Sequence, residues 1–199
     1  MNRICSAFAL GAGLFVAGTA LATPIQNTTG LASPAATITF DEFVFPQGTL
    51  ITNQFAGLGV TFSPGLQYDS QGPATFPGVT THYLGNNSPC CINPFSILFG
   101  GDITEAAFGV ATNPATTLFE ALYNGAVVES FSASTSFDGS TNYFFGFAGI
   151  TFDEIRVTVR GDNQILIDNV QIGSVPEPAS LALLGLGLAG LGLSRRRKA

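Results

Sequence analysis

Few side chains in this sequence have the types and spacing needed for catalysis. His82 is the only histidine; it lies in a Gly- and Pro-rich stretch, and no Gly-x-Ser-x-Gly motif accompanies it. Adjacent carboxylates occur twice, at Asp41-Glu42 and Asp153-Glu154. A glycosidase needs two carboxyl groups that face each other about 5–9.5 Å apart, whereas neighbouring residues of a strand point to opposite faces. Since neither pair alone forms such a site, we predict that the protein is not an enzyme.

Two of the three cysteines, Cys90 and Cys91, are adjacent in the chain. Neighbouring Cα atoms lie about 3.8 Å apart, which is less than the ~4.4–6.8 Å usual for a disulfide. The pair therefore forms a strained vicinal disulfide, remains as two unpaired thiols, or makes intermolecular bridges. A metal site needs more ligands than these two thiols and the distant His82 supply.

Negative charge dominates the middle of the chain. Between Thr23 and Ser174 there are twelve Asp and Glu residues, two Arg residues and no Lys, which gives a formal charge of −10. Such a surface repels phosphate backbones, so we expect no nucleic-acid partner. The negative charge either attracts a bound cation such as calcium or keeps an extracellular protein soluble.

Short runs of strand-forming residues separated by Gly, Pro and Asn fill the middle of the chain. The clearest signal is a hairpin in which Asn124-Gly125 joins residues 118–123 to 126–131, because this dipeptide fits the positive φ angles of a type I′ turn. Other strands are expected at 37–40, 57–62, 80–84, 96–99, 106–110, 143–147, 155–160 and 165–172. We predict an all-β fold at 37–173, an antiparallel β-sandwich or jelly roll of about nine short strands, after a flexible lead-in at 23–36.

The first 22 residues have the pattern of a helical secretory signal peptide. Arg3 provides a basic start, residues 4–16 are apolar, and Ala20-Leu21-Ala22 fits a small-x-small cleavage site. Signal peptidase and the general secretion machinery are therefore expected partners.

The last 25 residues form a tail with three parts. Pro176-Glu177-Pro178 opens it, an apolar stretch follows at 179–193, and Arg195, Arg196, Arg197 and Lys198 make a basic cluster. Fifteen helical residues extend roughly 22 Å, which is short of the ~30 Å hydrocarbon core. Because a basic cluster stays in the cytoplasm, we expect a transient inner-membrane anchor with the body on the far side.

This tail resembles the PEP-CTERM sorting signal of Gram-negative bacteria. The resemblance implies that exosortase, a membrane protease, recognises Pro176, Glu177 and Pro178 and removes the tail. It also implies a host that makes exopolysaccharide or biofilm matrix.

The body resembles carbohydrate-binding-module-like jelly rolls at residues 39–43, 52–62 and 167–170. The first and last strands of such folds run side by side, so the resemblance places Asp41 or Glu42 near Asp168. Carboxylates and backbone carbonyls there would hold a structural calcium ion, and no other cofactor is expected. The alternative is that Asp41 and Glu42 face solvent while Asp168 accepts a local hydrogen bond.

These features together predict a non-catalytic exported protein of the cell surface or extracellular matrix, associated with exopolysaccharide. A secreted hydrolase acting on polysaccharide and a purely structural coat protein are the alternatives. We expect four ring-bearing side chains to be exposed and to contact a sugar: Tyr68, His82, Tyr83 and Tyr143.

Overall fold

The computed structural model describes residues 22–69, 76–86, 93–138, 142–160 and 164–173. Residues 1–21 of the predicted signal peptide, the sorting tail and the Cys90-Cys91 pair lie outside these ranges, and so do the helices expected in both end segments. Within them, no helix is long and apolar enough to span a membrane.

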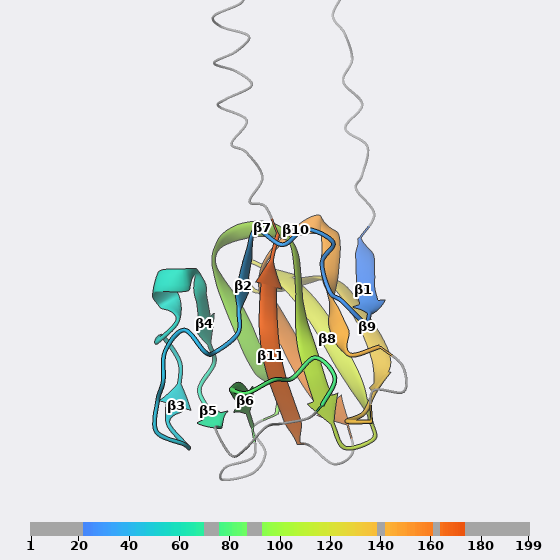
Figure 1. Ribbon diagram of the computed structural model, residues 1–199. Helices are drawn as coiled ribbons and strands as arrows, with labels where there is room; N and C mark the ends of the chain where they lie inside the picture. The colour runs from blue at the N-terminus through green and yellow to red at the C-terminus, as the bar shows by residue number, and fades with distance from the viewer. Residues whose placement is uncertain (1–21, 70–75, 87–92, 139–141, 161–163, 174–199) are drawn as a thin grey trace, which may run out of the picture.

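The regular secondary structure of the described body consists of antiparallel strands and one short 3-10 turn (Figure 1). In chain order the elements are β1 (Thr23–Asn27), β2 (Ala36–Ile38), β3 (Leu50–Ile51), the 3-10 turn η1 (Ala56–Leu58), β4 (Val60–Phe62), β5 (Leu66–Asp69), β6 (Tyr83–Gly85), β7 (Phe95–Thr112), β8 (Ala115–Tyr123), β9 (Ala126–Thr135), β10 (Phe144–Arg160) and β11 (Ile165–Ile172). The strand order is β3-β5-β6-β11-β7-β10-β8-β9, with β1 on β10, β2 on β11 and β4 on β7.

The two longest strands, β7 and β10, pair with each other in two stretches and at one position between them, where Ile103 meets Phe152. Residues 105–109 of β7 pair with 144–148 of β10, and residues 95–98 pair with 154–157. The register shifts between Ala148 and Glu154, and irregularities of this kind bend a sheet. Figure 1 shows β7 curving over at one end of the body.

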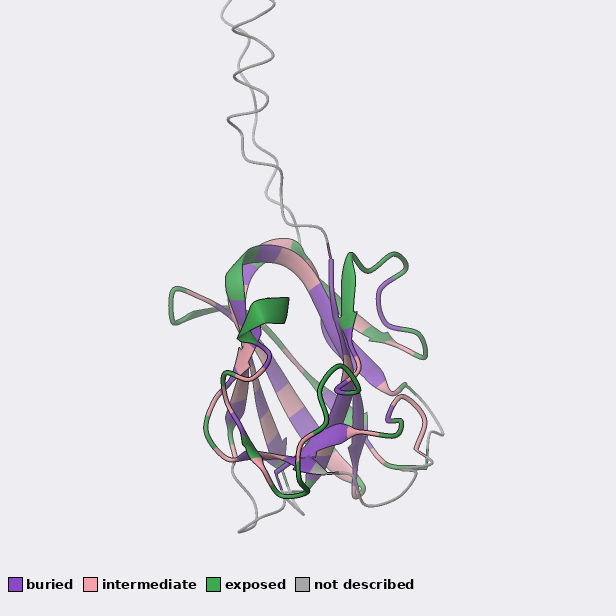
Figure 2. Ribbon diagram, turned by 60° about the vertical axis from the view of Figure 1, so that its left-hand side comes forward, coloured by how far each residue is buried: buried purple, intermediate pink, exposed green. Residues whose placement is uncertain are grey.

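This bend folds the sheet into two layers that enclose the core. Phe119 of β8 pairs with Val157 in the second half of β10. The ring of Phe119 also stacks on the ring of Phe145, with centroids 5.0 Å apart and planes at 10°. Phe145 lies in the first half of β10, twelve residues before Val157. Phe131 of β9 stacks on Phe119 as well, at 5.1 Å. Because Phe119 pairs through its backbone with one half of β10 and stacks its ring on the other half, the two halves face each other. Figure 2 shows buried residues concentrated along the strands.

The described chain enters and leaves the body at the same end. Thr23 of β1 pairs with Ala148, which in turn pairs with Glu105. The backbone N–H of Gly173, just after β11, donates to the carbonyl oxygen of the same Glu105 at 2.9 Å. The junctions with the predicted signal peptide and with the sorting tail are therefore adjacent.

The all-β antiparallel class and the hairpin are confirmed. Asn124 and Gly125 have φ angles of 51° and 77°, as a type I′ turn requires. The expected short strands at 96–99 and 106–110 are instead one strand, β7, and those at 143–147 and 155–160 merge into β10. The jelly-roll connectivity stays a prediction.

The stretch at 23–36 differs from the flexible lead-in that we expected. β1 pairs along its whole length with residues 144–148 of β10. Leu31 is buried, and its backbone N–H donates to the side-chain oxygen of Gln171 at 2.6 Å. This segment therefore packs onto the body through backbone pairing, for which the sequence TPIQN has no alternating apolar signal.

Candidate functional site

The loop formed by residues 76–82 lies against the outer face of the sheet, on the side away from the main core. Along β11, Ile165 and Ile167 belong to that core, so Leu166 and Asp168 point outward. Val79, Tyr83 and Ala111 form a small separate cluster there, against which Phe76 and Leu166 pack. We call residues 76–82 the covering loop.

Asp168 fastens the covering loop to the sheet. The backbone N–H and the hydroxyl of Thr80 both donate to its Oδ2, at 2.6 and 2.8 Å. The backbone N–H of Asn169 donates to its Oδ1 at 2.5 Å, and the Asn169 side chain donates to the carbonyl oxygen of Gly78 at 3.2 Å. One buried carboxylate therefore joins two segments 88 residues apart in the chain.

Burial raises the pKa of Asp168 from an ordinary 3.8 to about 6. The hydrogen bonds from Thr80 and Asn169 stabilise the charged form and limit this rise, while the negative charge of Asp41 adds to it. The carboxylate is completely buried, so both effects act with little screening by water.

Two glycines allow the covering loop to approach the sheet closely. Gly78 has a φ of 76°, a backbone angle that residues other than glycine rarely adopt. A Cβ atom on Gly109 of β7 would lie 2.0 Å from the carbonyl oxygen of Gly78. The loop can hold this position only because residue 109 has no side chain.

We predict that Gly109→Ala destabilises the protein by about 1–3 kcal/mol, because overpacking against a backbone atom forces the loop away. Gly101→Ala is the matched control on the same strand, since its added methyl group would meet no heavy atom within 4 Å. Its cost should stay within about 0.5 kcal/mol. Urea unfolding of the protein purified from its host measures both values, and equal costs would contradict the close approach of loop and sheet.

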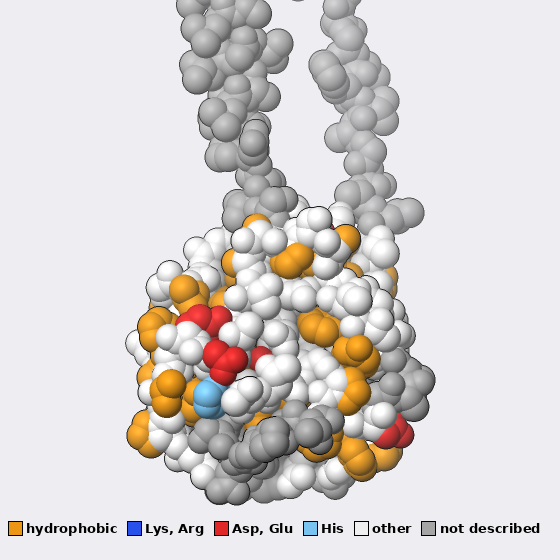
Figure 3. Space-filling model, viewed as in Figure 1, with side chains coloured by type: hydrophobic (Ala, Val, Ile, Leu, Met, Phe, Trp, Pro, Cys, Tyr) orange, Lys and Arg blue, Asp and Glu red, His pale blue; other side chains and the backbone are white. Residues whose placement is uncertain are grey.

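The far end of the covering loop brings His82 into an ion pair. His82 Nδ1 contacts Asp41 Oδ1, and the imidazole stacks on the ring of Tyr68 with centroids 5.2 Å apart and planes at 21°. Burial and the negative charge of Asp41 raise the pKa of Tyr68. Figure 3 shows acidic side chains gathered beside the histidine on this face. A carboxylate in contact with one ring nitrogen fixes the orientation of the imidazole.

The carboxylates predicted as calcium ligands lie in this region but take different partners. Asp41 pairs with His82, and Glu42 accepts hydrogen bonds from the backbone N–H and hydroxyl of Thr39, at 2.8 and 3.1 Å. Asp168 accepts those from Thr80 and Asn169. In the part of the chain that the structure describes, no group of three or more Asp, Glu, His or Cys residues is arranged to hold a metal ion.

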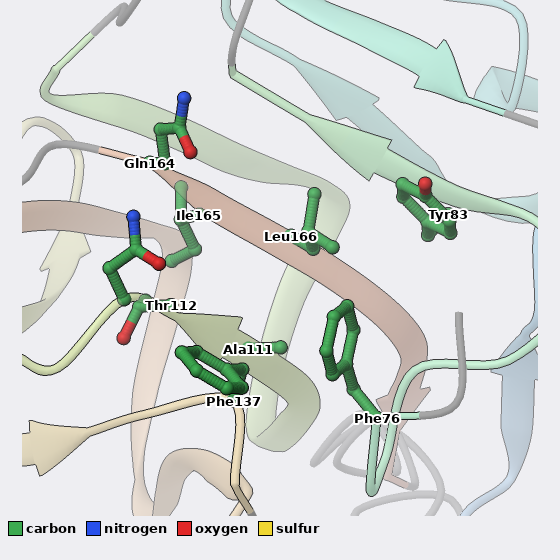
Figure 4. A pocket seen from close by; sticks show the side chains of 9 residues that line it. Phe76, Tyr83, Ala111, Thr112, Phe137, Gln164, Ile165 and Leu166 are labelled. Atoms are coloured by element: carbon green, nitrogen blue, oxygen red, sulfur yellow. The ribbon is translucent and has the colours of Figure 1, made fainter. Parts of the chain in front are cut away.

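A pocket of about 190 Å³ opens at the other end of the covering loop (Figure 4). Its rings come from Phe76, Tyr83 and Phe137, and its polar side chains from Thr112, Asn113 and Gln164. Phe76 and Phe137 contact edge to face at a centroid distance of 5.9 Å. Ala111 and Leu166, which are neighbours across β7 and β11, form part of its floor.

The residues expected to be exposed aromatic contacts are mostly not at the surface. Tyr68 and Tyr83 are buried, while His82 and Tyr143 are half-buried. Phe137, by contrast, is 44% exposed. Phe76 and Phe137 were not predicted from the sequence, because a phenylalanine near a strand is usually a core residue. The local signal for them was their placement beside Gly- and Pro-containing turns.

The remaining predicted site residues lie outside the described ranges. These are the sorting residues Pro176, Glu177 and Pro178, the basic cluster at 195–198, and Cys90 and Cys91.

Comparison with known proteins assigns the tail. Residues 174–198 match the family model described as the PEP-CTERM protein-sorting motif. The prediction made from the three-part tail is therefore confirmed. No curated protein matches the chain, and the likeness of the body to carbohydrate-binding modules stays a prediction.

Proposed function

Because the chain carries a PEP-CTERM motif, which marks exported and surface-directed substrates of exosortase, we propose that it is a non-catalytic protein of the cell surface or extracellular matrix. In this proposal it associates with the exopolysaccharide or biofilm of a Gram-negative host. The observation that carries the proposal is the match at residues 174–198.

The proposed route begins with the general secretion machinery and signal peptidase, which act on residues 1–22. The apolar part of the tail then holds the protein transiently in the inner membrane, with its basic cluster on the cytoplasmic side. Exosortase recognises Pro176, Glu177 and Pro178 and releases the body toward the surface. The structure is compatible with this route, because Gly173, after which the tail begins, lies at one end of the body beside the mature N-terminus at Thr23.

Two features support a neutral matrix polymer as the partner. The body has a formal charge of −10, so polyanions such as nucleic acid are repelled. The pocket beside the covering loop combines aromatic rings with uncharged polar groups, which is the usual lining of a small-ligand site.

A secreted polysaccharide hydrolase is the second candidate, and the Asp41–His82 pair is the observation that favours it. However, Asp153 accepts a hydrogen bond from the backbone N–H of Asn124, and Glu154 accepts one from the Ser96 hydroxyl. These adjacent carboxylates thus serve two different contacts. A purely structural coat protein that binds no ligand is the third candidate.

Intact-mass measurement of the protein from the envelope and the medium tests the sorting step. In the native host we expect a mass that lacks the signal peptide and the residues after the cleavage point in the tail. Replacing Glu177 and Pro178 with Ala should retain the tail, because the motif that exosortase recognises is lost. Glu129→Ala, which removes a carboxylate from β9, is the matched control and should be processed normally.

The same measurement in a strain without exosortase gives the opposing outcome. If the mass is unchanged between that strain and its parent, exosortase does not process this chain. The mass of the mature protein also reports whether Cys90 and Cys91 are oxidised.

A further inference from the structure

We propose that the pocket between Phe76, Phe137 and Gln164 binds one neutral sugar unit of a polysaccharide. This inference rests on the proposed association with exopolysaccharide and names the site and the ligand class.

The aromatic side of the pocket offers an apolar surface to a ligand. Phe137 follows β9 and is 44% exposed, although a phenylalanine is normally buried. Its ring is held by edge-to-face contact with Phe76, and Phe76 is fixed by a β-bridge to Val79 in the covering loop. Figure 4 shows the rings of Phe137 and Phe76 on either side of Ala111, with Leu166 nearby. The C–H face of a sugar ring can pack on such a surface.

The polar side chains that the structure describes in the pocket lining are uncharged. Asn113 and Gln164 contribute two amides, and no Asp, Glu, Lys or Arg is among the described residues that line the pocket. The hydroxyl of the buried Thr112 donates to Thr135. An amide both donates and accepts hydrogen bonds, as each hydroxyl of a sugar does. A ligand carrying a carboxylate or phosphate would meet no opposite charge among these described residues and would lie against an acidic body. The lining therefore favours a neutral, hydroxyl-rich molecule.

The size and position of the pocket also fit a single unit of a long chain. Its volume of about 190 Å³ is below the ~300–1,000 Å³ of pockets that enclose a whole drug-sized ligand. Glu105 of β7 contacts Gly173, so it marks the end of the body that joins the tail. Thr112, in the pocket lining, lies seven residues farther along β7. At about 3.3 Å per strand residue, the pocket is roughly 23 Å from that end. A polymer could enter the pocket while the other end of the body is held at the membrane.

Binding to exopolysaccharide purified from the host tests the inference. The polymer is divided by anion exchange into neutral and acidic fractions, and each is titrated calorimetrically into the protein purified from the host. We expect wild-type protein to bind the neutral fraction. Phe137→Ala and Gln164→Ala should each weaken binding about tenfold or more, because a packed ring and a polar contact are lost.

Phe43→Ala is the matched control, because Phe43 is also 44% exposed but packs against Phe45 and Phe55, away from the pocket. It should bind as wild type does. Gln164 has an exposed side chain, so Gln164→Ala keeps the test valid even if Phe137→Ala fails to fold.

The opposing results separate the two proposals. If wild-type protein binds the neutral fraction and both pocket variants bind equally well, the pocket is not the site, while the association with exopolysaccharide stands. Binding to the acidic fraction alone likewise overturns the pocket inference. If neither fraction binds, the proposed association fails and the pocket inference fails with it, whereas the sorting step is judged separately by mass.

Discussion

Phe119→Ala is expected to cost about 3–5 kcal/mol of the free energy of unfolding, the range for removing a large buried ring. Phe119 is fully buried and stacks on Phe145 and Phe131, and its centroid lies 6.0 Å from that of Phe108. Truncation would leave a cavity between the two layers of the folded sheet. Neighbouring strands are paired on both sides of this position, so the backbone can collapse only partly to fill it.

Urea unfolding of the protein purified from its host measures this cost. Phe119→Leu keeps more of the volume and should cost less than Phe119→Ala. Val127→Ala, at a 47% exposed position of β9, is the surface control and should change stability by about 0.5 kcal/mol or less. If Phe119→Ala costs no more than Val127→Ala, the two layers do not pack through this ring.

Local sequence patterns were sufficient to predict the fold class and the hairpin. The Asn124-Gly125 turn and the alternation in residues 155–160 depend on residues close together in the chain, and the structure has both. The length of β7 was not predictable in this way. Residues 100–102, Gly-Gly-Asp, resemble a turn, but Ile103 pairs with Phe152 of β10, and tertiary pairing carries the strand through.

The candidate site depends on contacts that no local pattern encodes. Asp168 meets Thr80 across 88 residues, and Asp41 meets His82 across 41. These contacts require the register of β6, β11 and β7 and the close approach of Gly78 to Gly109. The resemblance to jelly rolls did select Asp168 as a residue of interest, but it did not predict that the covering loop would supply its hydrogen bonds.

The raised pKa of Asp168 leads to the second large prediction, a loss of stability as pH rises. The unfolded chain releases the Asp168 proton near pH 3.8, whereas the folded protein keeps it until about pH 6. Between these values the folded state binds more protons than the unfolded state, so the free energy of unfolding falls with increasing pH. The contribution of this one group is about 3 kcal/mol at most, present in full below pH 3.8 and lost above pH 6.

Comparison of wild-type protein with Asp168→Asn isolates this contribution. The difference between their free energies of unfolding, measured in urea at intervals from pH 3.5 to 7.5, should change by about 3 kcal/mol across the window. Ionisable groups that do not interact with Asp168 contribute equally in both proteins and cancel in the difference. A difference that is constant with pH would mean that Asp168 is not the buried, proton-retaining group described here.

Thr80→Val then tests the cause of the shift as well as its existence. The Thr80 hydroxyl donates to Asp168 Oδ2 at 2.8 Å and stabilises the carboxylate. Its removal leaves a nearly isosteric side chain but takes away one donor, so the pKa of Asp168 should rise further. The window of declining stability should therefore extend to higher pH than in wild type. A shift to lower pH would contradict the hydrogen bond, and with it the role of Asp168 in holding the covering loop over the sheet and beside the pocket.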